Sequence, residues 1–115
     1  MVMRATRPIS WIKAARRDFD DFPQAAKDYF LDALTVIAEG GKPDTAKPLK
    51  GLGSSIMELA LRHRGDAYRV VYALQLAGEI WVIHAFQRKL KTGIKTPRGE
   101  IALVTERLKR LKEAR

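Results

Sequence analysis

The chain has 115 residues, of which 46% are hydrophobic and 30% charged, and this suffices for one globular domain with a modest core. It contains no Cys and only two His, so disulfides and thiolate metal sites are excluded and a structural zinc site is not expected. The formal net charge is +9, and all of it arises after residue 46: residues 1–46 hold seven basic and seven acidic side chains, whereas residues 47–115 hold fifteen and six.

This charge asymmetry predicts an anionic partner for the second part of the chain. Nucleic acid is the first expectation and an acidic protein the second, while a surface that only keeps the protein in solution is the alternative without a ligand. The N-terminal stretch MVMRATRPISWIKAARR lacks the apolar segment of a signal peptide. No window of the sequence approaches the roughly eighteen apolar residues of a membrane span. We therefore expect a cytoplasmic protein that has no membrane partner.

The first part of the chain predicts a short extended segment and two helices. Residues 8–12 suggest a brief strand, and residues 13–21 favour a short helix that Pro23 stops. Pro23 then suits the first position of a second helix, where its missing N–H is not needed. Gly40 and Gly41 are expected to end this helix. Apolar or small residues recur in pairs along one stripe of it: Ala25/Ala26, Tyr29/Phe30, Ala33/Leu34 and Ile37/Ala38.

Three strands are predicted after a loop that spans residues 42–55. Residues 56–63 form the first strand, with Glu58 and Arg62 on the face opposite to its apolar residues. Residues 68–75 and 79–87 form the second and third strands around a tight turn, and their nearly continuous apolar character places them at the centre of a sheet. A basic loop over residues 88–95 leads to a last helix, in which Thr96 is the expected N-cap and Pro97 the first helical residue.

The order of these elements predicts an α+β fold in a single domain, residues 1–115. We expect a small antiparallel sheet with N-terminal helices and a C-terminal helix packed on it, all against one face. The opposite face would then have no element to cover it. An open sheet face beside a basic loop is a natural docking surface for an anionic partner.

Arg69 is the single residue that most suggests a site, because it interrupts an apolar strand on the same side as Val71 and Ala73. Arginine is rarely placed among core residues unless it is paired or lines a site. Three interpretations stay open: Arg69 lines a site, lies on the open surface of the sheet, or pairs with Glu58 on a neighbouring strand.

His84 lies on the third strand, where simple alternation groups it with Val82 and Phe86. It is either a hydrogen-bonded core histidine or a general acid or base, since imidazole titrates near neutrality. The pattern leaves both alternatives open.

Arg88, Lys89 and Lys91 follow this strand and form a cluster that can bind phosphate, neutralise charge or stay solvated. The sequence holds no convincing Ser/His/Asp set, no pair of carboxylates, and no P-loop or dinucleotide glycine pattern. If the chain is an enzyme, cations must do most of its chemistry. Phosphodiester cleavage meets this condition, because a ribose 2′-OH can attack its neighbouring phosphate while fixed Arg and Lys groups stabilise the charge on the phosphate oxygens.

Several stretches together resemble the RelE/HigB superfamily of toxins from bacterial toxin–antitoxin pairs, most closely its phage-derived Gp49-like, HigB-type branch. They are KPLKGLGSSIMELALRHRGDAYRVVYAL, IWVIHAFQRKLKTGIKTP and the helix that ends in ERLKRL. AYRVVY and HAFQRK…KTP, in that order, are the more specific parts of the likeness. The resemblance covers most of residues 8–112.

The resemblance implies a RelE-like fold and a metal-independent, cofactor-free endoribonuclease, an mRNA interferase that cuts messenger RNA on the ribosome and inhibits growth. It also implies inhibition by a small HigA-like antitoxin with a helix-turn-helix. Carried over by motif, Arg69 matches the strand arginine that stabilises the scissile phosphate. Lys89 with Arg88 matches the basic pair after the last strand, which stabilises the transition state and donates a proton to the 5′-oxygen. The residues expected to hold the RNA backbone are Lys50, Arg64, Lys91 and Lys95.

The chain departs from RelE where the general base is concerned. RelE carries lysines on the strand before the hairpin, where this chain has Glu58 and Ala60, and a tyrosine near the start of the last helix, where this chain has Thr96. We therefore expect His84 as the general base, with Glu58 as the second choice. A non-catalytic module that binds RNA or an antitoxin through its basic surface is the alternative function, and Glu58 in place of a family lysine keeps this alternative open.

Overall fold

The computed structural model describes residues 6–53, 55–89 and 96–114. In these ranges three helices surround a five-stranded sheet. The elements are β1 (Ile9–Trp11), α1 (Lys13–Asp20), α2 (Gln24–Ala38), β2 (Lys47–Pro48), β3 (Ile56–His63), β4 (Asp66–Leu76), β5 (Glu79–Lys89) and α3 (Arg98–Glu113). The strand order is β1-β5-β4-β3-β2. β1 runs parallel to β5, and the other neighbouring strands are antiparallel. The predicted α+β fold, a largely antiparallel sheet with helices packed on it, is confirmed.

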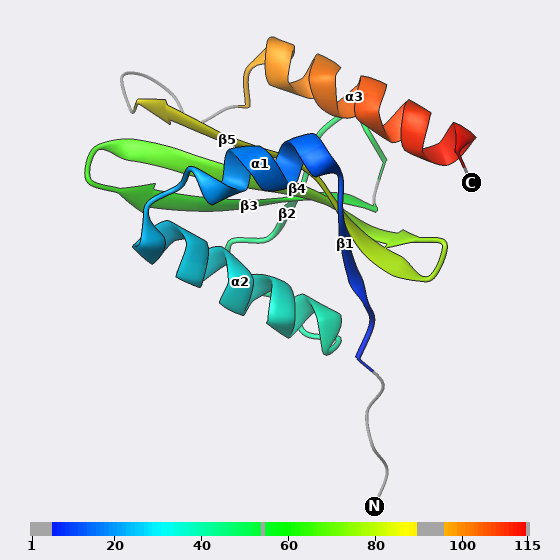
Figure 1. Cartoon of the computed structure of the whole chain (residues 1–115), viewed down its shortest axis with the longest axis horizontal. Coiled ribbons are helices and arrows are strands. Elements are labelled where there is room, and N and C mark those ends of the chain that lie inside the picture. The colour runs from blue at the N-terminus through cyan, green and yellow to red at the C-terminus, as the bar shows by residue number, and fades with distance from the viewer. Residues whose placement is uncertain (1–5, 54, 90–95, 115) are drawn as a thin grey trace, which may run out of the picture.

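The helices lie on both faces of the sheet, with α1 and α2 on one face and α3 on the other (Figure 1). The core between these two helices and the sheet includes Phe19 of α1, Phe30 and Leu34 of α2, and Leu59 and Val70 of the sheet. On the opposite face, Val104 and Leu108 of α3 pack over Val71, Ala73 and Ile83. The expectation that all helices share one face and leave the other open is therefore wrong. The apolar seam of α3 needs a surface to bury it, and that face of the sheet provides one.

α2 ends at the glycine pair, as predicted. Gly40 N–H donates to Ile37 O at 3.0 Å and Gly41 N–H donates to Val36 O at 2.8 Å. Gly40 has φ of 94°, a left-handed conformation that glycine adopts without steric cost. This pattern is a Schellman motif, which satisfies the last carbonyls of the helix and turns the chain back toward the sheet.

Several element boundaries differ from those predicted. β5 continues to Lys89, so Arg88 and Lys89 belong to a strand and not to the basic loop. Within the predicted loop 42–55, residues 47–48 form the edge strand β2. Pro97 and not Thr96 occupies the N-cap of α3, which leaves the Thr96 hydroxyl for another contact. No helix in the described ranges is long and apolar enough to cross a membrane.

β5 contains a bulge that the sequence pattern does not reveal. Tyr72 pairs with Val82, but the preceding Val71 pairs with His84, so Ile83 is an extra residue on β5. An inserted residue reverses the alternation of the side chains that follow it. Val82 consequently packs toward α1 and α2, whereas Ile83 and His84 lie on the side of α3. The predicted grouping of His84 with Val82 is wrong for this reason.

Replacing Phe30 tests the larger core. Phe30 is fully buried, and its ring centroid lies 5.3, 5.9 and 6.4 Å from those of Tyr29, Phe22 and Phe19. Phe30→Ala should lower the free energy of unfolding by about 3–5 kcal/mol, because it removes buried apolar surface and leaves a cavity. The neighbouring Leu31 is 42% exposed, so Leu31→Ala should cost less than about 1 kcal/mol. Urea denaturation measures both changes, and equal losses would contradict the burial of this stripe of α2.

Candidate nucleic-acid interface

The register of the three long strands gathers arginines on the face of the sheet that carries α3. Ala67 of β4 lies directly between Arg62 of β3 and Arg88 of β5. Arg69 follows Ala67 by two residues, and Val71 follows Arg69 by two and packs in the core beneath α3. Directly opposed residues, and residues two apart on one strand, point to the same face. Arg62, Arg69 and Arg88 therefore share this face.

A lysine at the sheet edge extends the arginine group. Lys47 of β2 lies directly opposite Glu58 of β3, so the two side chains share the same face. Lys47, Arg62 and Arg88 are exposed and Arg69 is mostly buried. We call these four side chains the cationic face. Lys47 and Arg62 were not among the predicted site residues. Alternation had already placed Arg62 beside Glu58, whereas nothing in the sequence indicated the pairing of β2.

Arg69 pairs with Glu58 of β3 and with Thr96, which precedes α3. Its Nη1 donates to Glu58 Oε1 at 2.8 Å and to the Thr96 hydroxyl at 3.1 Å. The Thr96 hydroxyl in turn donates to the other oxygen of Glu58. The side chains of Arg69 and Glu58 are each 12% exposed, so little water competes for the pair. Of the three interpretations of Arg69, the pairing with Glu58 is the one observed, and it places a carboxylate inside the cationic face.

The start of α3 adds partial positive charge beside Arg69. Pro97 is the N-cap, and Glu100 N–H donates back to the Pro97 carbonyl at 3.1 Å. The N–H groups that precede Glu100 in the first turn point out of the helix. A helix end of this kind attracts anions through its amides and its dipole. The hydrogen bond between Thr96 and Arg69 holds it next to the cationic face.

His84 is 3% exposed and lies between β5 and α3. Its Nε2 is 2.7 Å from Glu100 Oε1, and its Nδ1 is 3.1 Å from Arg107 Nη1. A guanidinium can only donate, so Nδ1 accepts and the ring proton is on Nε2, facing Glu100. The imidazole also stacks on Phe86, with ring centroids 5.1 Å apart. Both ring nitrogens are engaged, as in a core histidine.

Arg107 ties α3 to β5. Besides its contact with His84, Nη1 donates to the carbonyl of Ile83, the extra residue of the bulge, at 3.1 Å. Burial has the largest effect on the pKa of Arg107 and lowers it. The charge of Asp18 raises this pKa, the charge of Arg17 lowers it and the charge of Glu100 raises it. Arginine starts from so high a pKa that the guanidinium stays charged at neutral pH. The periodicity of the sequence could not reveal this contact, because it joins residues of two different elements.

The other predicted site residues lie at the margin of the cationic face or outside it. Lys89 is exposed at the end of β5, where the pleat of the strand turns it away from the side of Arg88. Lys50 is exposed in the turn after β2. Arg64 is exposed in the turn between β3 and β4, with φ of 50°. Lys91 and Lys95 lie outside the described residues.

The chain resembles known proteins in sequence and in fold. A family model described as phage derived protein Gp49-like matches residues 17–109. Among solved structures, a mutant of E. coli toxin RelE in the free state matches with a TM-score of 0.64 and 17% identity, over 91% of this chain and 97% of that one. The toxin–antitoxin complex RelBE2 from Mycobacterium tuberculosis matches with a TM-score of 0.44 and 21% identity, over 75% and 95%. No curated protein matches. The first structure shows that the fold is RelE-like, as predicted.

Removing Arg107 tests the polar contacts between α3 and β5. Arg107→Met keeps much of the side-chain stem but leaves His84 Nδ1 and the Ile83 carbonyl without their donor, so it should lower the free energy of unfolding by about 1–3 kcal/mol. Arg110→Met is the matched control, because Arg110 lies on the same helix and its side chain is 77% exposed. Urea denaturation gives both values. A loss for Arg107→Met no larger than that for the control would contradict this role.

Proposed function

This chain belongs to the family of phage-derived Gp49-like proteins, and on that premise we propose that it is a RelE-type toxin that cuts messenger RNA on the ribosome. The partner that restrains it is a HigA-like antitoxin with a helix-turn-helix, and both act in the cytoplasm. The RelE-like fold and the family support this proposal. A short open reading frame for such an antitoxin next to the gene would support it further.

The cationic face is the observation that carries the proposal. Lys47, Arg62, Arg69 and Arg88 point to one side of the sheet, beside the positive end of α3. Four cations on one face of the sheet can hold successive phosphates of a single strand, since each phosphate is bound by a donor that carries positive charge. Glu58 lies among these cations, and its carboxylate can accept the proton that the attacking ribose 2′-OH must lose.

The chemistry follows from these positions. The ribose 2′-oxygen attacks the adjacent phosphorus and gives its proton to Glu58, while the bond from phosphorus to the 5′-oxygen breaks. Arg69, already oriented by Glu58 and Thr96, donates to the phosphate oxygens on which charge accumulates. Arg88 and Arg62 hold the flanking backbone. Arginine does not release its proton near neutrality, so we assign the proton of the leaving 5′-oxygen to Lys89, whose exposed side chain leaves the end of β5 on the other side of the strand and reaches the cationic face only around that end.

The proposed reaction needs neither a metal ion nor a cofactor. The side chains named above supply a base, a proton donor and the positive charge. Cleavage should therefore persist when a chelator such as EDTA is added together with enough magnesium to keep the ribosomes intact.

A second function is favoured by the pairing of Arg69. Because Glu58 neutralises Arg69 at 2.8 Å, the face could serve only to bind RNA or an antitoxin, without catalysis. Binding of this kind depends on salt but yields no cleaved transcript. The two functions are therefore separated by the products formed with translating ribosomes.

Induced expression in a bacterial host tests the catalytic proposal. The wild type should arrest growth and cut transcripts, and Arg69→Ala should reduce cleavage by about 10²–10³-fold, because it removes the group that stabilises the charged phosphate. Glu58→Gln should reduce cleavage by about 10²–10⁴-fold through loss of the base. Arg110→Ala removes one exposed cation far from the site and should behave as the wild type. A folded Arg69→Ala protein with undiminished toxicity would refute the assigned role.

The salt dependence of RNA binding tests the cationic face itself. On a single-stranded RNA, each phosphate contact contributes about 0.7 to the slope of log K against log salt concentration. Arg62→Ala and Arg88→Ala should each lower the slope by about this amount, and Arg110→Ala should leave it unchanged. Fluorescence anisotropy at several salt concentrations gives the slopes. Equal slopes for all variants would show that RNA binds elsewhere.

A further inference from the structure

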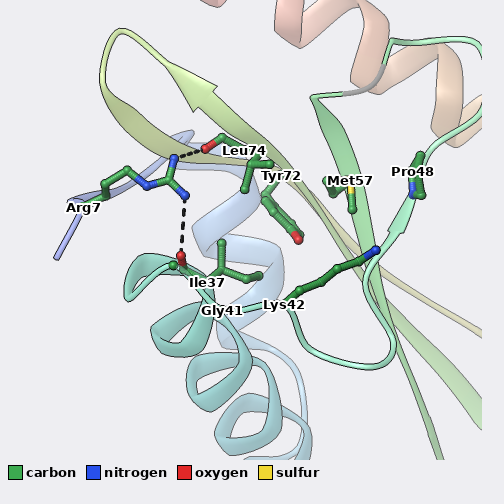
Figure 2. Close-up of a pocket in the computed structure, with 9 residues that line it drawn as sticks. Arg7, Ile37, Gly41, Lys42, Pro48, Met57, Tyr72 and Leu74 are labelled. Atoms are coloured by element: carbon green, nitrogen blue, oxygen red, sulfur yellow. Dashed lines mark hydrogen bonds between the residues drawn. The ribbon is translucent and has the colours of Figure 1, made fainter. Parts of the chain in front are cut away.

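A pocket of about 430 Å³ lies on the face of the sheet that carries α2 (Figure 2). β4 separates it from the cationic face, because Tyr72 packs toward α1 and α2 whereas Val71 packs toward α3. Its volume falls within the range of roughly 300–1,000 Å³ that is usual for small-ligand sites. The apolar part of its wall consists of Ile37, Pro48, Met57 and Leu74, and the polar part of Arg7, Lys42 and Tyr72.

The hydroxyl of Tyr72 is the group in this pocket that the fold does not use. The residue is 1% exposed, yet its hydroxyl makes no hydrogen bond to any residue that the structure describes. Burial raises the pKa of Tyr72 to about 12, with an opposing effect of the Arg7 charge, so the hydroxyl is protonated at neutral pH and can donate. A phenylalanine ring would fill the same space in the core. The hydroxyl faces the pocket, so its hydrogen bond is left for water or for a ligand bound there.

Two cations line the pocket on opposite sides of the Tyr72 ring. Arg7 donates from Nη1 to the Leu74 carbonyl and from Nη2 to the Ile37 carbonyl, which fixes the guanidinium against the end of α2. Lys42 runs along the other side of the pocket, and the Tyr72 ring stands between the two in Figure 2 with its hydroxyl toward Lys42. Neither cation pairs with a carboxylate in the described parts of the chain.

A purely structural role explains only one of the three polar groups. Arg7 ties the segment before β1 to α2 and β4 through backbone carbonyls, and that contact needs no ligand. Neither the unpartnered hydroxyl of Tyr72 nor the charge of Lys42 takes part in it. What they have in common is that both donate toward the same space, next to the thioether of Met57 and the side chain of Ile37.

We propose that this pocket binds a carboxylate that carries a short apolar group. The carboxylate accepts from the Tyr72 hydroxyl and is neutralised by Lys42, while the apolar group rests on Met57 and Leu74. Charge-assisted hydrogen bonds to a carboxylate are the strong kind, and the apolar wall adds the burial that a small ligand needs. The same chemistry is found in a free small acid and in an acidic residue beside an apolar one in a bound peptide.

The test uses the whole chain labelled with ¹⁵N and two probes, 4-methylpentanoate for the free acid and a capped Leu-Glu dipeptide for the peptide. Titration should shift the amide signals of Gly40 and Gly41, with a dissociation constant of about 1 mM for the free acid, as suits so few atoms. The neutral 4-methylpentanamide should bind at least about tenfold more weakly. The probe that binds more tightly shows whether the carboxylate comes from a free acid or from a peptide. Tighter binding of either probe supports the proposal.

Variants show whether the named donors are responsible. Tyr72→Phe and Lys42→Gln should each weaken binding about tenfold, since each removes one donor to a charged acceptor. Tyr72→Phe keeps the buried ring and Lys42 is exposed, so both should fold, which a thermal melt verifies. Lys109→Gln removes an exposed charge from α3 and should bind as the wild type does. Unchanged affinity in both pocket variants, or no shift with either probe, would overturn the proposal. No RNA enters this measurement, so it stands apart from the proposed function.

Discussion

The burial of β4 on both faces is the constraint on which the rest of the structure depends. Val70 and Tyr72 pack toward α1 and α2, and Val71 and Ala73 pack toward α3. A polar residue on such a strand must have a partner or lie where the covering helix begins, because an unpaired charge in the core is costly. Arg69 meets both conditions. It lies at the start of α3 and is bound there by Glu58 and Thr96.

Polar contacts at two places determine where α3 lies on the sheet. Thr96 joins its start to the pair of Arg69 and Glu58, and Arg107 joins its middle to His84 and the bulge of β5. Buried pairs of this kind add little net stability, but the loss of one partner is costly. Their consequence is positional: the positive end of the helix is held beside the cationic face. The opposite face of β4 presents the pocket around Tyr72, so one strand separates two surfaces of different chemistry.

Much of the fold could be predicted because each element carries its own periodicity. The stripe on α2 was correct except for Ala25, which is exposed, and the glycine pair that ends the helix was correct. The phase of β3 was also correct and by itself put Glu58 and Arg62 on one face. The bulge at Ile83 defeated the same reasoning on β5, since one extra residue reverses every side chain beyond it. β2 was missed because two residues are too few for a pattern. The side taken by α3 was missed because its seam fits either face of a sheet.

By itself the sequence determined the three long strands, the placement of the positive charge after residue 46 and the likeness to RelE-type toxins. These features are local, and they can be seen without knowing which strands are neighbours. Only the tertiary structure decided which distant side chains meet. Glu58 contacts Arg69, eleven positions away, and Thr96, thirty-eight positions away. Arg107 contacts His84, twenty-three positions away. The physical reason is that each of these contacts depends on register and on the face a helix covers, and periodicity within one element contains neither.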